Sequence, residues 1–228
     1  MWYSSFADTD LEKRKKESIV NKYQQQSAGP QKEASNTGKN AGGAQKPYVG
    51  KAALPHFKYH PDPLGTGSLR EAEPPEVCEC CGQETAIVYD GPFYAVHRPK
   101  CLCPGCIASG RAAETFHGEF QDSESVDAGI SDPAMLDELT QRTPGYAGIQ
   151  QEYWRVHCKE PCAFLGYVGW QELCQLGLVD EVLDDPTLQR EWDDLREMLQ
   201  SLENGGWTQG YLFRCLHCGR HLLWVDCD

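Results

Sequence analysis

Residues 77–94 read VCECCGQETAIVYDGPFY, and they place three cysteines, Cys78, Cys80 and Cys81, within four positions. Three thiols this close together indicate a metal site, part of a disulfide network, or an activated nucleophile. Residues 215–219, CLHCG, repeat the C-x-x-C-G pattern of residues 78–82. Two thiolates two residues apart can bind one metal ion where the backbone turns tightly, and the glycine permits the positive φ of that turn. Both segments are therefore predicted to be metal-binding knuckles.

Each knuckle supplies two ligands, whereas a closed structural zinc site needs four. Two further cysteine pairs, C-P-G-C at 103–106 and C-x-x-x-C at 158–162, can complete the sites. Pairing by proximity gives one site across the 21 residues 82–102, which is the layout of a zinc ribbon. The second site would close a long loop containing helices, a clip that limits the entropy of the unfolded chain. We predict two structural zinc ions, held by Cys78, Cys81, Cys103 and Cys106, and by Cys158, Cys162, Cys215 and Cys218.

Other cysteines and one histidine keep alternative ligand sets open. Cys80 and Cys101 each lie close to a presumed ligand and could replace it, and His157 could substitute for its neighbour Cys158. Cys174 lies in an apolar segment, so it is predicted to be a small buried hydrophobic residue. His157, His217 and His221 are otherwise expected to make surface or supporting hydrogen bonds.

The metal sites are predicted to be structural, and the chain is predicted not to be an enzyme. A catalytic zinc ion usually has three protein ligands and an open position, whereas thiols are in excess here. The zinc deaminase signature needs H-x-E before P-C-x-x-C, and YAVHRPKCLCPGC (94–106) has no H-x-E. The CPGC pair leaves thiol redox chemistry as an alternative, although such a motif is expected after a strand in a βαβ unit.

Composition separates the chain into two parts. Residues 1–50 are rich in Gln, Lys, Ser, Asn and Gly and are predicted to be disordered or linker-like, with a possible short helix over 8–25. All twelve cysteines lie beyond residue 77, in the predicted zinc-binding domain 51–228. The sequence lacks the layout of a signal peptide and any run of 18 apolar residues, so we expect a cytoplasmic protein with no membrane association. Disulfides are rare in that reducing compartment, which again favours metal binding.

Charge indicates the kind of partner. The net charge is −13, and residues 51–228 hold 29 acidic and 13 basic residues once the five and eight of residues 1–50 are subtracted. Such a body is a poor nucleic-acid binder but attracts basic proteins. Two runs, 112–141 and 180–203, carry eight and nine acidic residues. The candidate contacts to a basic partner, such as a nuclease, are Glu119, Asp122, Asp193, Asp194 and Glu197.

The pattern predicts an α+β fold, with small zinc-ribbon or knuckle elements and short β-hairpins packed against several α-helices. A hairpin is expected over 85–96 around Asp90-Gly91-Pro92, and helices over 133–141, 149–158 and 169–177. The longest predicted helix covers 185–206, with Asp185 as N-cap and one apolar face. That face consists of Leu188, Trp192, Leu195, Leu199 and Leu202. Strands are expected on both sides of the last cysteine turn.

Several stretches together resemble the CbrC family of bacterial proteins. They are LPHFKYHPDPLGTGS (54–68), CECCG (78–82), CPGCIASGRAAETFHGEFQD (103–122), RTPGYAGIQQEYWRVHC (142–158), PCAFLGYVGW (161–170) and FRCLHCGRHLLWVDCD (213–228). The family often has tryptophan where this chain has Gly105, a departure that leaves the ligands untouched.

The CbrC resemblance implies a cytoplasmic protein without established enzymatic activity, linked to colicin tolerance and similar to immunity proteins. We therefore expect an immunity protein that binds and neutralises a cognate toxin, namely a basic nuclease domain. Two alternatives stay open. One is a thiol redox or metal-dependent stress-response enzyme that uses the CPGC pair, and the other is a zinc-dependent adaptor for protein interactions.

Overall fold

The computed structural model describes residues 54–227 of the chain, so the disorder and the short helix predicted within residues 1–50 lie outside it. The first part of the fold is built on a two-stranded antiparallel sheet. Strand β1 (Leu69–Val77) pairs with β2 (Glu84–Tyr89), and the first cysteine knuckle forms the connection between them. Two short helices follow, α2 (Pro104–Ala108) and α3 (Arg111–Phe116).

The hairpin predicted around Asp90-Gly91-Pro92 was wrong. Strand β2 ends at Tyr89, and its partner is the strand before it, not the segment after the turn. The Asp90 N–H donates to the Ser68 carbonyl at 2.9 Å, and the Tyr89 N–H donates to the Leu102 carbonyl at 3.0 Å. Turn residues mark where a chain can reverse, but the available partners decide which strands pair.

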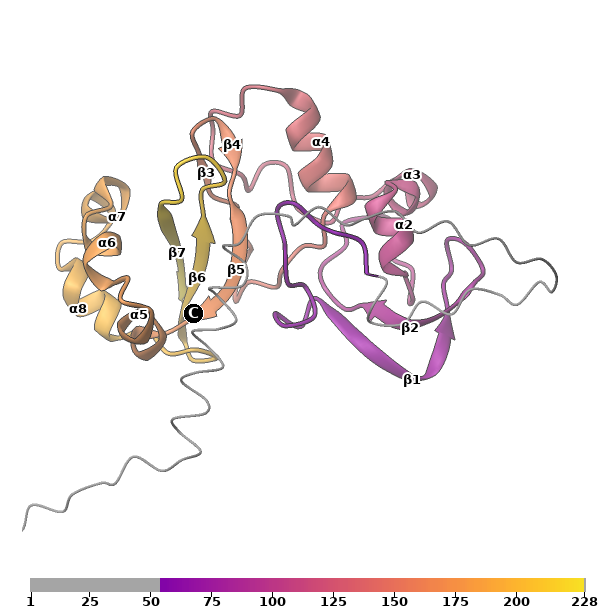
Figure 1. Cartoon of the computed structure of the whole chain (residues 1–228), viewed down its shortest axis with the longest axis horizontal. Helices are drawn as coiled ribbons and strands as arrows, with labels where there is room; N and C mark the ends of the chain where they lie inside the picture. The colour runs from indigo at the N-terminus through magenta and orange to yellow at the C-terminus, as the bar shows by residue number, and fades with distance from the viewer. Residues whose placement is uncertain (1–53, 228) are drawn as a thin grey trace, which may run out of the picture.

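The second part is built on a three-stranded antiparallel sheet in the order β5-β6-β7. These strands are β5 (Ala163–Val168), β6 (Thr208–Arg214) and β7 (His221–Cys227), so strands do flank the last cysteine turn as predicted. A short hairpin of β3 (Val156–His157) and β4 (Glu160–Pro161) comes before them. Helix α4 (Pro133–Arg142) confirms the predicted helix over 133–141 and contacts both α3 and β4, so it joins the two parts. Figure 1 shows α4 between them.

Four helices cover one face of this sheet: α5 (Trp170–Leu176), α6 (Val179–Leu183), α7 (Pro186–Glu191) and α8 (Leu195–Gln200). Alternation along the strands divides the sheet residues between two cores. Leu212 and Leu223 pack with the helices, whereas Phe213 and Tyr211 pack on the opposite face. The result is the α+β fold expected from the sequence.

The long helix predicted over 185–206 is two helices. Its predicted start is confirmed, because the Asp185 side chain accepts a hydrogen bond from the Thr187 N–H and Pro186 is the first helical residue. The helix ends before Trp192, whose φ of −128° and ψ of 122° are extended, and α8 begins after Asp194. Aspartate favours a cap over a helix interior, and Asp194 accepts the Glu197 N–H at 2.9 Å.

The apolar face predicted for residues 185–206 is nevertheless a core face. Leu188, Leu195, Leu199 and Leu202 are buried, and Trp192 packs partly against them. Helix α5 confirms the prediction over 169–177, but Cys174 on it is exposed, not buried. Its side chain lies on the face of α5 away from Leu173, which is fully buried.

The helix predicted over 149–158 was also wrong. The N–H groups of Ile149 and Gln150 donate to Oδ2 of Asp226, and the Trp154 N–H donates to the Ser125 carbonyl. The first N–H groups of a helix have no partner within it, so the Trp154 bond is the decisive one, together with the Tyr153 N–H, which donates to the Tyr146 hydroxyl at 2.8 Å. In a helix these two N–H groups would donate to residues 149 and 150. Within residues 54–227, no helix is long and apolar enough to cross a membrane.

Candidate metal centres

The first group of metal-binding side chains consists of four thiols. The sulfurs of Cys78, Cys81, Cys103 and Cys106 all lie within 4.8 Å of one another. Sγ of Cys78 is 3.9 Å from Sγ of Cys106, and Sγ of Cys81 is 3.9 Å from Sγ of Cys103. Four thiolates about 2.3 Å from a tetrahedral zinc ion are roughly 3.8 Å apart, whereas disulfide sulfurs are about 2.05 Å apart. The spacing therefore fits a metal ion.

Two local backbone features hold these thiols together. Gly82 has a φ of 69°, which allows its N–H to donate to the Cys78 carbonyl at 2.8 Å and close the knuckle. Cys103 is the N-cap of α2, and its N–H donates to Sγ of Cys78 at 3.3 Å. The Cys103 side chain and the surrounding N–H groups lower the pKa of the Cys78 thiol to about 4, against the opposing effect of burial. The fold thus favours the thiolate that a metal ion needs.

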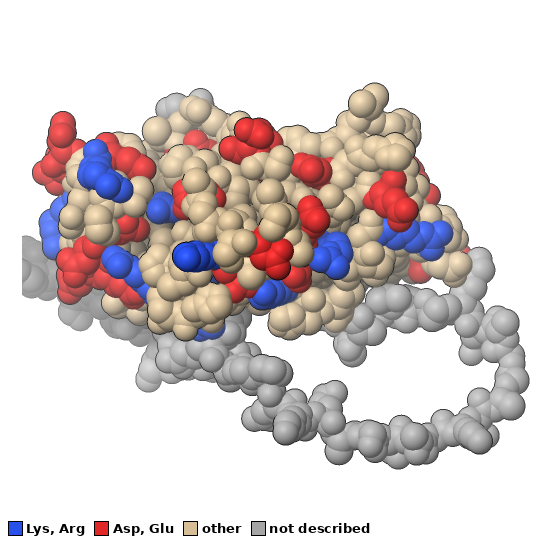
Figure 2. Space-filling model, turned by 90° about the horizontal axis from the view of Figure 1, so that it is seen from above, with Lys and Arg blue, Asp and Glu red and all other residues tan. Residues whose placement is uncertain are grey.

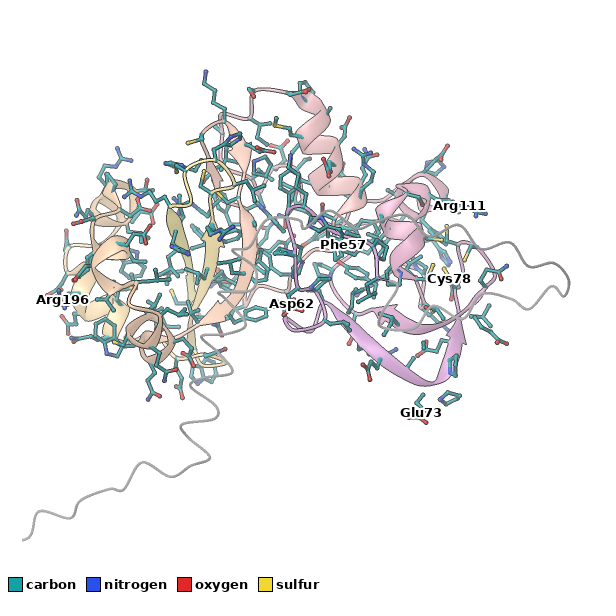
Figure 3. The ribbon with its side chains drawn as sticks, viewed as in Figure 1. Phe57, Asp62, Glu73, Cys78, Arg111 and Arg196 are labelled. Atoms are coloured by element: carbon teal, nitrogen blue, oxygen red, sulfur yellow. The ribbon has the colours of Figure 1, made fainter. Side chains whose placement is uncertain are left out.

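The group lies beside α2, inside the hydrophobic core formed by β1, β2, α2 and α3. Figure 3 shows Cys78 there among other sulfur atoms. Cys78 is fully buried and Cys106 is 5% exposed. The two neighbouring cysteines are outside the group. Sγ of Cys80 lies 3.7 Å from Oγ1 of Thr115, and Cys101 is buried on the opposite side of β1–β2, where burial raises its pKa to about 11.

The second group consists of one imidazole and three thiols: His157, Cys158, Cys215 and Cys218, whose donor atoms lie within 4.8 Å of one another. Nδ1 of His157 is 3.3 Å from Sγ of Cys158 and 3.3 Å from Sγ of Cys218. Tetrahedral bonds of about 2.3 Å to sulfur and 2.05 Å to nitrogen place such atoms roughly 3.5 Å apart. The donor set and its spacing again fit one metal ion.

Two turns bring the second group together. The β3–β4 turn has a φ of 52° at Cys158 and of 67° at Lys159, and the β6–β7 turn has a φ of 76° at Gly219. The Gly219 N–H donates to the Cys215 carbonyl at 3.1 Å, as Gly82 does in the first knuckle. The Arg220 N–H lowers the pKa of the Cys218 thiol.

Cys162, predicted as the fourth ligand of this group, does not join it; His157 does. Cys162 is fully buried in the aromatic core with Phe164 and Trp154, and its carbonyl accepts the Trp154 indole N–H at 2.8 Å. Side chains alternate along a strand, so Cys162 and Phe164 face the same side. The sequence indicates His157 only as a substitute for Cys158; its position before a two-residue turn is the signal that could have identified it as a further donor.

The buried carboxylate of Glu160 holds together the two turns that carry the second group. Glu160 is 4% exposed and is contacted by the side chains of Lys58, Tyr59 and His217. Burial opposes ionisation, but the hydrogen bonds from Lys58, Tyr59 and His217 outweigh it and lower the pKa of Glu160. The contact between Glu160 and His217 holds the β3–β4 hairpin against the β6–β7 turn. His217 and His221 make the supporting contacts expected of them, His221 with Glu181 at 3.1 Å.

Comparison with known proteins gives the family. The chain matches, over residues 54–227, the model of an uncharacterised protein family, UPF0167. This chain belongs to the UPF0167 family. The resemblance to the CbrC family inferred from the motifs was wrong, because the matching model and the three curated relatives described below carry the UPF0167 name.

Similar UPF0167 proteins occur in distant bacteria. The UPF0167 protein PA1536 of Pseudomonas aeruginosa is 40% identical over 172 residues, which cover 73% of this chain and 93% of that protein. The UPF0167 proteins Mb2317 of Mycobacterium bovis and MT2352 of Mycobacterium tuberculosis are each 39% identical over 176 residues, 76% of this chain and 93% of theirs. No solved structure gives a significant match.

The ligand assignment in this UPF0167 chain is testable with two substitutions. His157→Ala should reduce the metal content by one ion per chain, because a three-donor remnant binds more weakly. Cys162→Ala should keep both ions and lose only about 1 kcal/mol of stability, the transfer energy of a small buried group. Native mass spectrometry of both variants measures the content. Loss of an ion from Cys162→Ala, with retention in His157→Ala, would restore the assignment made from the sequence.

Proposed function

We propose that this protein is a zinc-stabilised binding protein, not an enzyme, and that it recognises a basic protein partner. The observation that carries the proposal is the number of donors. Each group supplies four side chains, which fill the coordination of a tetrahedral ion and leave no position for water or substrate. Metal ions held in this way stabilise a fold and do not activate a reactant.

The donors favour zinc as the ion. Thiolate and imidazole ligands in a tetrahedral arrangement suit zinc, whereas calcium and magnesium need oxygen ligands. None of the twelve cysteines forms a disulfide, and Cys174 and Cys227 are exposed and belong to neither metal group. Exposed thiols persist in a reducing compartment, so we place the protein in the cytoplasm.

The acidic surface of α7 and α8 supports the choice of partner. Asp193, Asp194 and Glu197 are all exposed, and Figure 2 shows acidic side chains, with basic ones among them, at the end of the molecule that carries these helices. Asp194 and Glu197 border a groove of about 400 Å³ that is also lined by Trp192 and Met198. A lysine or arginine side chain can place its aliphatic stem on such apolar residues and its charge near the carboxylates.

The other two predicted contact residues, Glu119 and Asp122, are less accessible to a partner protein. Glu119 and Asp122 are partly buried, and Asp122 accepts hydrogen bonds from the Glu124 N–H and the Gln151 side chain. The Glu119 carboxylate accepts hydrogen bonds from Ser123, and the Asp122 N–H donates to the Glu152 carboxylate at 3.5 Å, so both residues are engaged within one loop. The proposed interface is therefore centred on Asp193, Asp194 and Glu197.

The specific partner that we propose is a nuclease toxin, which the chain would bind and neutralise as an immunity protein. A nuclease needs a basic surface to meet phosphate, and an acidic protein can cover that surface. This part of the proposal rests on charge complementarity and on metal groups whose four donors leave no open coordination position.

The test is affinity for a basic protein that co-purifies with the chain from its own host. The double variant Asp193→Lys/Glu197→Lys should lower the association rate for that protein by roughly tenfold or more at low salt, because it reverses steering charges. It leaves Asp194, the cap of α8, in place. Surface plasmon resonance at two salt concentrations measures both the rate and its salt dependence.

The matched control is Glu73→Lys/Glu84→Lys, which changes the net charge equally on two exposed residues of β1 and β2. It should leave the association rate within about twofold of that of the unmodified protein. Equal loss in both double variants would show that only net charge matters. No co-purifying basic protein at all would remove the basis of the proposal.

A thiol redox enzyme is the main alternative. Cys103 and Cys106 do lie at the start of a helix, as a redox pair requires, yet each also lies 3.9 Å from a sulfur of the first knuckle. Rapid alkylation of Cys103 or Cys106 in the metal-loaded protein would favour this alternative. A zinc-dependent adaptor is distinguished by a partner that has no toxic activity.

A further inference from the structure

The two metal groups differ sharply in exposure. In the first group Cys78 and Cys106 are buried, and Cys81 and Cys103 are only partly accessible. In the second group Cys158 and Cys218 are exposed, His157 is partly exposed, and Cys215 alone is buried. Oxidants and competing ligands therefore reach the second group far more readily than the first.

The exposed pair in the second group is also close enough to react. Sγ of Cys158 and Sγ of Cys218 lie within 4.8 Å of each other on two separate turns. Both turns are short surface loops with left-handed residues, Cys158 and Lys159 in one and Gly219 in the other. A small displacement of such loops brings two sulfurs to the bonding distance of about 2.05 Å.

A hollow lies beside His157, one of the four donors of the group. It has a volume of about 420 Å³ and is lined by His157 together with Arg155, Arg190 and Arg220. Peroxide and small chelators fit within this volume.

We propose that the second group is an oxidation site of the protein, at which Cys158 and Cys218 form a disulfide and the metal ion is released. This inference rests on the metal-binding part of the proposed function. Hydrogen peroxide takes two electrons from the two thiolates, its O–O bond breaks as the S–S bond forms, and two protons complete two water molecules. The ion keeps only His157 and Cys215 as ligands and dissociates.

The disulfide replaces the metal ion as the link between two turns of the fold. It joins the β3–β4 turn to the β6–β7 turn, the same two segments that the metal ion holds. The contact between Glu160 and His217 joins them as well. The oxidised protein therefore stays folded, and the first group keeps its ion.

The experiment uses the full chain loaded with zinc and treated with hydrogen peroxide in stoichiometric steps. A chromogenic zinc chelator follows the ions released, and peptide mapping without reductant locates disulfides. We expect one ion per chain to be released at least tenfold faster than the other, together with a Cys158–Cys218 disulfide. A reductant and added zinc should restore the starting state.

Cys174→Ser and Cys227→Ser serve as controls, because these exposed thiols belong to neither group. Each should release zinc at the rate of the unmodified protein. Simultaneous release of both ions, earlier loss from the first group, or a disulfide between other cysteines would overturn the inference. Fewer than two ions before peroxide is added would instead contradict the metal content of the proposed function.

Discussion

Replacing Cys78 with serine should remove the first metal ion and disrupt the part of the fold that surrounds it. Cys78 is fully buried, its sulfur accepts the Cys103 N–H, and it belongs to the four-thiol group that could hold the ion. Structural zinc contributes roughly 10–16 kcal/mol to the folding of zinc-finger peptides, which matches or exceeds the 5–15 kcal/mol stability of a typical domain. A loss of even a third of that should lower Tm by roughly 10 °C or more.

Native mass spectrometry and thermal unfolding followed by circular dichroism measure the two effects of Cys78→Ser. Cys174→Ser is the matched control, since it makes the same chemical change on the exposed face of α5. It should retain two ions and an unchanged Tm. A Cys78→Ser protein with two ions and a normal Tm would show that the four-thiol group does not hold a structural metal ion.

Trp154→Ala should be the most damaging single change away from the metal groups. Trp154 is fully buried between Tyr146 and Phe213, with ring centroids 5.6 Å from each. Its indole N–H also donates to the buried Cys162 carbonyl. Truncation of a buried tryptophan costs about 3–5 kcal/mol, and the unpaired carbonyl adds about 1–3 kcal/mol. Denaturant unfolding of the metal-loaded protein measures the difference.

Trp154→Phe separates the two contributions, because it keeps an aromatic ring but removes the N–H donor. It should lose about half as much stability as Trp154→Ala, and both variants should still bind two metal ions. A loss below about 1 kcal/mol in Trp154→Ala would mean that residues 149–155 do not pack in the aromatic core.

The parts of the fold that could be predicted from sequence depend on short-range chemistry. The C-x-x-C-G spacing indicated both knuckles, because a thiolate pair and a positive-φ glycine act within five residues. Asp132 with Pro133, and Asp185 with Pro186, indicated two helix starts for the same reason. The apolar segments on both sides of the last cysteine turn indicated β6 and β7.

The errors concern residues whose partners are distant in the chain. Residues 149–158 have a helical pattern, yet the Trp154 N–H, which a helix would use, donates to the Ser125 carbonyl 29 residues earlier in the chain. After the Asp90-Gly91 turn the chain does not pair with β2, which already pairs with β1; Tyr94 forms a bridge with Glu119, 25 residues later, instead. In both cases a long-range contact replaced the local structure that the sequence favours.

The sequence by itself determined that this protein has an α+β fold with two cysteine-rich groups able to hold metal ions. The tertiary structure alone decided the members of the second group. Cys158 and Cys162 look equivalent in the sequence, but strand alternation directs Cys162 into the aromatic core, while the β3–β4 turn brings His157 to the thiols. The same packing decided that the first group is buried and the second exposed, since exposure depends on the elements that cover a residue and not on its neighbours in the chain.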